Sequence, residues 1–238
     1  MTIYGKQLFL HVLERRPNTL KIVYLAKDVD KGVFAKIAKS GAKVVRVDER
    51  KAQALARGGN HQGFLAEIEA FKFETFAEVK KRDKIAFLYG VSDVGNAGAI
   101  VRSAYALGAD ALIWANKNLA QNEGSEVAQN GAVAGLLRAS SGAAFELPIA
   151  LVVDPLTALN ELAQSSHALY AAAAGGVEPK DFKFESRFAL VMGGEGDGLP
   201  RKALEKCDGV LGIRMREGWD SLNVSVAFGI LFDRIING

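Results

Sequence analysis

One stretch of the chain decides how the rest is interpreted. It consists of Ile85-Ala86-Phe87-Leu88-Tyr89 and, shortly afterwards, Asp93-Val94-Gly95-Asn96-Ala97-Gly98-Ala99-Ile100-Val101-Arg102-Ser103-Ala104. The first run is apolar and has the length of a buried strand. The second opens with residues that can cap a helix, Asp93 or Asn96, and continues with Ala, Ile and Val. A buried strand followed directly by a helix is the repeating unit of a parallel α/β sheet.

Further units of the same kind follow along the chain. Apolar runs of strand length alternate with helix-length segments and predict strands at residues 111–114, 149–153, 168–171, 188–192 and 210–215. This series predicts a mostly parallel sheet with helices on both faces. The last predicted helix, residues 221–236, is apolar on most sides. It must therefore be buried, either in the core or against a second subunit.

The first 70 residues predict a separate, smaller α/β unit. Residues 71–83 are more charged and predict a linker that carries a short helix. The expected organisation is an N-terminal domain at 1–70, a linker at 71–83 and a C-terminal domain at 84–238. The N-terminal strands are expected at residues 20–25, 43–47 and 64–68, with helical segments at 33–38 and 50–57.

Composition sets broad limits on function. The chain has 238 residues and a net charge of +3, which is too mild to demonstrate a polyanionic partner. Cys207 is the single cysteine, so no intrachain disulfide forms, and no neighbouring His or Cys suggests a metal site. We expect Cys207 to be a small buried side chain. Without a signal pattern or an apolar run of membrane-spanning length, the expected location is the cytoplasm.

Polar or glycine-rich segments follow three of the predicted strands, where ligands bind in open α/β sheets. The first is the Asn96 segment quoted above. The second, Gly193-Gly194-Glu195-Gly196-Asp197-Gly198, lets the backbone approach a ligand closely but matches no phosphate-binding loop. In the third, Ser221 is a good helix N-cap, while Asn223 and Ser225 are polar residues within an apolar helix and need partners.

Together the three segments resemble the three motifs of the SpoU (TrmH-like) family of RNA 2'-O-ribose methyltransferases, in the family's order. The matching runs are Asn96 to Ala104, Gly193 to Gly198 and Ser221 to Ala227. Ser140-Ser141-Gly142-Ala143 and Leu147-Pro148 resemble the family's middle segment, and Tyr4-Gly5 and His61-Gln62-Gly63 resemble its small ribosomal-protein-like RNA-binding domain. That domain is carried by the bacterial 23S rRNA guanosine-2'-O-methyltransferases.

The resemblance implies a C-terminal SPOUT domain with a trefoil knot, S-adenosylmethionine as cofactor and a homodimer with active sites at the subunit interface. It also implies that backbone groups of the second and third segments hold the cofactor. Carried over residue by residue, the cofactor-binding positions are Gly193, Gly194, Gly196, Ile213, Met215 and Leu222.

The resemblance also suggests catalytic roles for Arg102, Asn96, Ser221, Asn223 and Glu195. Arg102 is a poor candidate for the base, because a guanidinium keeps its proton above roughly pH 12. It would rather anchor the target phosphate or stabilise charge on the 2'-oxygen. Ser221 and Asn223 would orient the ribose or relay its proton, and Asn96 would hold Arg102 or the substrate.

In the N-terminal domain, the resemblance makes His61 and Gln62 candidates for RNA contact. A His that stabilises its own loop is an equally good interpretation of His61.

The chain departs from the family pattern at Val94, Arg214 and Glu217, where members usually have Pro, Pro and often Gly. The last two departures bear on cofactor affinity and loop shape. The favoured interpretation is methylation of 23S ribosomal RNA, with guanosine as the expected base. The alternatives are a tRNA 2'-O-methyltransferase and an inactive RNA- or ribosome-binding relative. An unrelated nucleotide-binding enzyme is disfavoured because a phosphate loop is missing.

Overall fold

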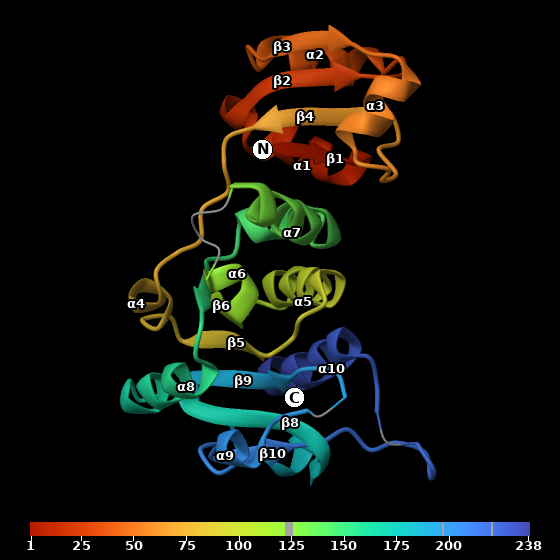
Figure 1. The fold of residues 1–238 in the computed structure, drawn as a ribbon. Coiled ribbons are helices and arrows are strands. Elements are labelled where there is room, and N and C mark those ends of the chain that lie inside the picture. The colour runs from red at the N-terminus through yellow and green to blue at the C-terminus, as the bar shows by residue number, and fades with distance from the viewer. Residues whose placement is uncertain (122–125, 197, 220) are drawn as a thin grey trace.

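The computed structural model describes residues 1–121, 126–196, 198–219 and 221–238, and the side chains of these ranges except 126–130. It contains two β-sheets that lie one above the other, with the N-terminal sheet at the top of Figure 1. Within the described ranges, no helix is long and apolar enough to cross a membrane.

The C-terminal part is built on a parallel sheet whose described strands run in the order β10-β8-β9-β5-β6-β7. This arrangement confirms the predicted parallel α/β architecture. Nearly all of the predicted strand positions are also confirmed. The strands are β5 (Lys84–Tyr89), β6 (Ala111–Ala115), β7 (Ile149–Val152), β8 (Ala168–Val177), β9 (Phe188–Gly193) and β10 (Gly209–Leu211).

Two strands differ in length from the sequence-based expectation. β10 ends at Leu211 rather than at residue 215, and β8 runs on to Val177. The two backbones approach closely at this place, because a Cβ on Gly212 would lie 2.5 Å from the Gly176 carbonyl oxygen. The pairing register shifts at this place. After Leu211 the chain leaves the sheet and continues as a loop.

Helices cover both faces of this sheet, as the alternating pattern predicted. The helices α5 (Val94–Ala106), α7 (Glu126–Ala139) and α10 (Val224–Asn237) pack on one face, and α4 (Phe76–Val79), α8 (Pro155–Gln164) and α9 (Arg201–Leu204) on the other. Gly98 lets α5 pack closely against α7, because a Cβ there would overlap the Ala139 side chain. The remaining short helices are α6 (Lys117–Gln121), η2 (Ala143–Phe145) and η3 (Pro179–Asp181).

The N-terminal sheet is mixed rather than parallel. Its described strands are ordered β1-β4-β2-β3, with β2 parallel to β3 and β4 antiparallel to both β1 and β2. The first strand and helix had no sequence signal strong enough to predict them, since a three-residue strand shows no periodicity. The elements are β1 (Thr2–Tyr4), α1 (Lys6–Arg15), η1 (Pro17–Thr19), β2 (Leu20–Leu25), α2 (Lys31–Lys39), β3 (Lys43–Arg46), α3 (Glu49–Leu55) and β4 (Phe64–Ile68).

Polar contacts join the two parts of the molecule. The Arg138 guanidinium lies 4.6 Å from the centre of the Tyr4 ring and donates a hydrogen bond to the Tyr4 hydroxyl. His11 Nε2 and Glu146 Oε1 are 3.0 Å apart. The apolar core also continues from the N-terminal sheet to the C-terminal one. The N-terminal part is therefore docked on α7 and η2.

Candidate functional site

A cavity of about 730 Å³ opens where β8 and β9 end, beside the residues that follow β10. The carboxyl ends of parallel strands are the expected place for a ligand. Its volume lies within the roughly 300–1,000 Å³ of small-molecule sites. Nine of the positions predicted from sequence line it: Gly193, Gly194, Glu195, Gly196, Ile213, Met215, Ser221, Leu222 and Asn223.

The glycine loop after β9 forms one wall of this cavity. A Cβ on Gly193 would lie 2.5 Å from the Gly198 backbone, and one on Gly194 would lie 2.6 Å from the Gly90 carbonyl oxygen. Gly196 has a φ of 91°, which side-chain-bearing residues rarely adopt. These glycines allow the loop to fold on itself and to present backbone rather than side chains to the cavity.

A chain of hydrogen bonds brings three of the predicted residues together. Asn223 donates through Nδ2 to Asn96 Oδ1 at 2.9 Å, and Asn96 donates through Nδ2 to Glu195 Oε1. Asn223 Oδ1 in turn accepts hydrogen bonds from the Ser225 amide and hydroxyl. The three side chains come from α5, the glycine loop and the start of α10, which are far apart in sequence. Glu195 and Asn223 line the polar end of the cavity, and Asn96 joins them from behind through its hydrogen bonds.

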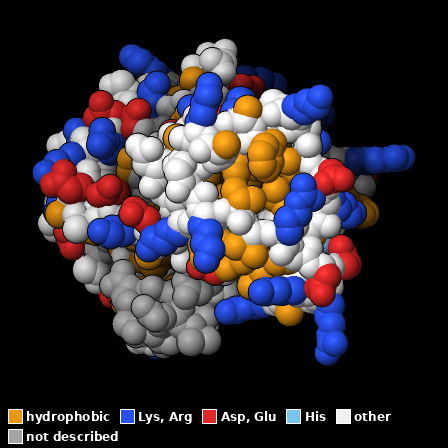
Figure 2. All heavy atoms as spheres, turned by 90° about the horizontal axis from the view of Figure 1, so that it is seen from above, with side chains coloured by type: hydrophobic (Ala, Val, Ile, Leu, Met, Phe, Trp, Pro, Cys, Tyr) orange, Lys and Arg blue, Asp and Glu red, His pale blue; other side chains and the backbone are white. Residues whose placement is uncertain are grey.

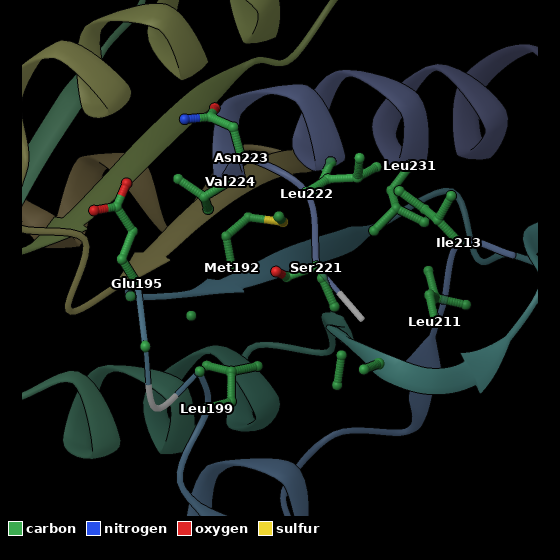
Figure 3. Close-up of a pocket in the computed structure, with 18 of the residues that line it drawn as sticks. Met192, Glu195, Leu199, Leu211, Ile213, Ser221, Leu222, Asn223, Val224 and Leu231 are labelled. Atoms are coloured by element: carbon green, nitrogen blue, oxygen red, sulfur yellow. The ribbon is translucent and has the colours of Figure 1, made fainter. Parts of the chain in front are cut away.

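The prediction that Ser221 caps the last helix is wrong. The helix begins at Val224, and Asn223 is its N-cap. Asn223 can cap because its side-chain oxygen accepts from the Ser225 amide while its Nδ2 remains free to donate to Asn96. Among the described residues, the Ser221 hydroxyl forms no hydrogen bond, and it points into the cavity in Figure 3.

The opposite end of the cavity is apolar. Figure 3 shows Leu211, Ile213 and Leu231 there, while Glu195 and Asn223 lie at the other end. The cavity therefore offers an apolar compartment and a hydrogen-bonding one, which suits a ligand with an aromatic part and a polar part.

Arg102 does not line this cavity. It lies on α5, exposed, with its Nη1 3.5 Å from the Ser141 hydroxyl. Asn96 and Arg102 are six residues apart on the same helix, so their side chains point in different directions and about 9 Å separates them along the axis. Asn96 is therefore hydrogen-bonded to two residues that line the cavity, whereas Arg102 has no contact with it.

In the N-terminal domain, His61 and Gln62 hold a turn. His61 is buried, with Nδ1 accepting from the Gly63 amide at 3.0 Å and Nε2 lying 3.1 Å from Glu49 Oε1. Gln62 is exposed, and its side-chain oxygen accepts from the Lys6 amide. This burial favours the loop-stabilising interpretation of His61.

Cys207, the single cysteine of the chain, was expected to be a buried side chain. Cys207 is partly buried and donates to the Ala203 carbonyl, and burial raises the pKa of its thiol to about 11. At neutral pH this thiol stays protonated and unreactive. Among the described residues, no cluster of His, Cys, Asp or Glu is arranged to hold a metal ion.

A parallel α/β sheet with a glycine-lined cavity at its carboxyl edge defines an α/β ligand-binding protein. The model of the SpoU rRNA methylase family matches residues 83–233, and the model of the RNA 2'-O ribose methyltransferase substrate-binding domain matches residues 2–74. The chain belongs to the SpoU rRNA methylase family.

Curated relatives cover most of this chain. A protein of Haemophilus ducreyi named 23S rRNA (guanosine-2'-O-)-methyltransferase RlmB is 28% identical, over 98% of this chain and 96% of its own length. A protein of the same name from Xylella fastidiosa is 34% identical, over 83% of this chain and 79% of its own.

Solved structures show the same fold. The AdoMet-bound rRNA methyltransferase of Sinorhizobium meliloti matches with a TM-score of 0.74 at 22% identity, over 98% of this chain and 85% of that one. The SpoU methyltransferase AviRb of Streptomyces viridochromogenes, in complex with AdoMet, matches with a TM-score of 0.75 at 19% identity, over 99% of this chain and 89% of that one.

Family membership confirms that the protein is an RNA methyltransferase and that S-adenosylmethionine is its cofactor. The described cavity fits that molecule. Its apolar end can take an adenine ring and its polar end an aminoacyl group. The glycine loop has no side chains at Gly193 and Gly194, where a Cβ would collide with neighbouring backbone, so its backbone groups face the cavity directly.

Proposed function

We propose that the protein methylates the ribose 2'-hydroxyl of a guanosine in 23S ribosomal RNA. The relatives that carry this name align over most of the chain. The observation that carries the proposal is the meeting of Asn96, Glu195 and Asn223 at the polar end of the cavity. Nothing in an α/β scaffold alone requires three polar side chains from distant segments to converge beside a glycine loop.

In this proposal the backbone groups of the glycine loop and of the third segment hold the cofactor, at Gly193, Gly194, Gly196, Ile213, Met215 and Leu222. When bound, S-adenosylmethionine supplies an electrophilic methyl group on a positively charged sulfur. The Ser221 hydroxyl lies in the cavity and can accept a hydrogen bond from the ribose. The network fixes the amide of Asn223, and the Glu195 carboxylate at its end adds negative charge beside the cationic cofactor.

Arg102 lies outside the cavity of its own chain, and we propose that the protein is a homodimer in which Arg102 reaches the cavity of the other subunit. The exposed face of α5 carries Arg102 among small residues, Gly95, Ala99 and Ala106, which permit close approach of another chain. Beside it α10 exposes Val226 and the preceding loop exposes Leu222. A second copy packed on this surface would bring the Arg102 of each subunit toward the cavity of the other.

RNA contact is proposed for the N-terminal domain, residues 1–70, which the linker at 71–83 joins to the methyltransferase domain at 84–238. The first 70 residues hold 13 Lys and Arg against 7 Asp and Glu, whereas the whole chain holds 30 against 27. Figure 2 looks down on this end and shows basic side chains around an exposed hydrophobic patch. Among the exposed large hydrophobic side chains of this domain are Phe34 of α2 and Val44 of β3. A basic surface with an exposed aromatic ring suits RNA. Gln62 is exposed beside the start of α1 and is a proposed RNA contact. The cytoplasm is the expected compartment of the protein.

The test is transfer of a tritiated methyl group from S-adenosylmethionine to separated rRNA and tRNA from a strain that lacks the gene. We expect one labelled ribose in 23S RNA, at a guanosine, and none with Arg102→Ala. Label in tRNA alone would overturn the proposed substrate. Absence of transfer to any RNA, despite measurable cofactor binding, would overturn the proposed activity.

A further inference from the structure

The loop between β10 and α10 carries the one exposed tryptophan of the described chain. Trp219 is 69% exposed, whereas Trp114 is buried in the core with its indole N–H bonded to the Val91 carbonyl. The Trp219 position is fixed by a turn in which its amide donates to the Arg216 carbonyl at 3.1 Å. Gly218 provides the left-handed residue of this turn, with a φ of 78°. An ordered turn therefore presents a large aromatic ring to solvent.

This loop lines a second hollow of about 430 Å³ beside the cofactor cavity. The two hollows share Ala174, Ile213 and Met215 as a common wall. A ligand in the second hollow would therefore be a direct neighbour of the methyl donor. Trp219 and the two arginines Arg214 and Arg216 belong to its lining.

The charge around Trp219 favours an anion. Among the described residues, Arg214 and Arg216 are exposed and form no ion pair. The Glu178 carboxylate on the opposite wall is occupied by Lys180 at 3.0 Å. The pKa of Glu178 is lowered mainly by the hydrogen bond from Lys180, and to a smaller extent by the charge of Arg214. Glu217 is the remaining carboxylate of the lining and lies between the two arginines in sequence.

We propose that Trp219 stacks on an unpaired base of the RNA at or next to the nucleotide that is methylated, while Arg214 and Arg216 bind the phosphates on either side. This inference rests on the proposed function and adds the contact that selects the target site. An exposed aromatic ring with arginines is the usual means of holding a splayed-out base.

A second copy of the chain is the competing occupant of this surface. Interfaces between protein subunits are depleted of charged residues at their centre. Trp219 shares its hollow with four charged residues, whereas Leu222 and Val226 offer an apolar surface for a dimer elsewhere. The charge pattern therefore favours RNA at Trp219.

The experiment uses the full chain and an unmodified 23S RNA transcript as the probe. Because Trp114 is buried, quenching of tryptophan fluorescence by acrylamide reports mainly on Trp219, and Trp219→Phe supplies the background. We expect the transcript to protect Trp219 from acrylamide and S-adenosylmethionine alone to leave it accessible. We expect Trp219→Ala to raise the KM for RNA by about tenfold, within the five- to 150-fold range of one stacked base. Its Kd for the cofactor should stay unchanged.

The conservative variant and the arginines sharpen the test. Trp219→Phe keeps an aromatic face and should recover most of the RNA affinity, which a purely structural loop residue would not show. Arg214→Gln and Arg216→Gln should each weaken RNA binding and reduce its salt dependence. An unchanged KM for RNA in active Trp219→Ala, or conversion of that variant to a monomer in sedimentation, would overturn the proposal. Inactivity of the unaltered protein would instead refute the proposed function, while the fluorescence and binding measurements still decide the role of Trp219.

Discussion

Asn223 shows how one side chain can serve both the fold and the site. Its oxygen caps α10 by accepting from the Ser225 amide, and its nitrogen donates to Asn96. Replacement by Ala should remove both interactions. We expect Asn223→Ala to lose about 1 kcal/mol of unfolding free energy, the usual value of an N-cap, together with most methyl transfer. Thermal unfolding and the tritium assay measure the two effects on the same preparation.

Asn223→Ser separates the two roles. Serine is a good N-cap, so this variant should keep the stability of the unaltered chain. It has no amide nitrogen to donate to Asn96, so methyl transfer should still fall by about 100-fold. Full activity in Asn223→Ser would show that the Asn223–Asn96 contact is irrelevant to the reaction.

His167 gives the protein a defined pH sensitivity. The ring is buried at the start of β8, its Nε2 lies 2.7 Å from the Arg82 carbonyl, and its Nδ1 has no partner among the described residues. Burial lowers the pKa of His167 below its usual value near 6.5. The folded state therefore resists a proton that the unfolded chain accepts. The stability contributed by the neutral ring is present above about pH 6.5 and is lost as the pH falls toward the lower folded pKa.

The matched variant is His167→Gln, whose amide can still donate to the Arg82 carbonyl but does not titrate. Between about pH 7.5 and 5.5 we expect the unaltered protein to lose more unfolding free energy than this variant. Denaturant unfolding at both pH values measures the difference. Identical pH dependence in the two proteins would contradict the assignment.

At the scale of elements, the glycine loop is the part least tolerant of side chains. Gly193→Ala would place a Cβ 2.5 Å from the Gly198 backbone. The loop must then shift, and we expect S-adenosylmethionine binding, measured by calorimetry, to weaken by tenfold or more. Gly131→Ala is the control, since in α7 the nearest atom to the new Cβ is Arg57 Nη1 at 3.8 Å. It should leave binding unchanged and add about 0.5–1 kcal/mol of stability. Equal cofactor affinity in both variants would remove the loop from the site.

The element scale also shows what the sequence predicts well. The apolar periodicity placed strands such as β2 and β4 at their observed ends. The sequence did not predict which residue caps α10, because Ser221 and Asn223 are both good N-caps. The hydrogen bond between Asn223 and Asn96, a contact between distant segments, favours Asn223. The apolar periodicity also extended β10 past Leu211, because the close approach of Gly176 and Gly212 is a contact between distant segments, which periodicity does not report.

For the whole molecule, the sequence predicted which segments meet at the cavity better than it predicted where each side chain lies. Nine predicted positions meet at one cavity, because motifs at the ends of parallel strands share one edge of the sheet. Arg102 is the exception. Its motif predicted a role beside Asn96, but six residues of helix turn the two side chains apart. Neither a strand pattern nor a helix pattern contains information on a second subunit. The trefoil knot stays a prediction for the same reason, since threading leaves no periodic signal.

The placement of Arg102 leads to a test by mixing two inactive variants. In the proposed homodimer, Arg102→Ala and Asn223→Ser should each lose most methyl transfer when every subunit carries the same substitution. If Arg102 acts on the cavity of the other subunit, a mixed dimer contains one complete site, formed by the Asn223 of one chain and the Arg102 of the other. Random exchange makes half of the dimers mixed, so activity should return to about a quarter of the unaltered level. If Arg102 serves the cavity of its own chain, no site in any dimer is complete, and the mixture should stay as inactive as its components. Methyl transfer measured after exchange therefore decides between the two arrangements.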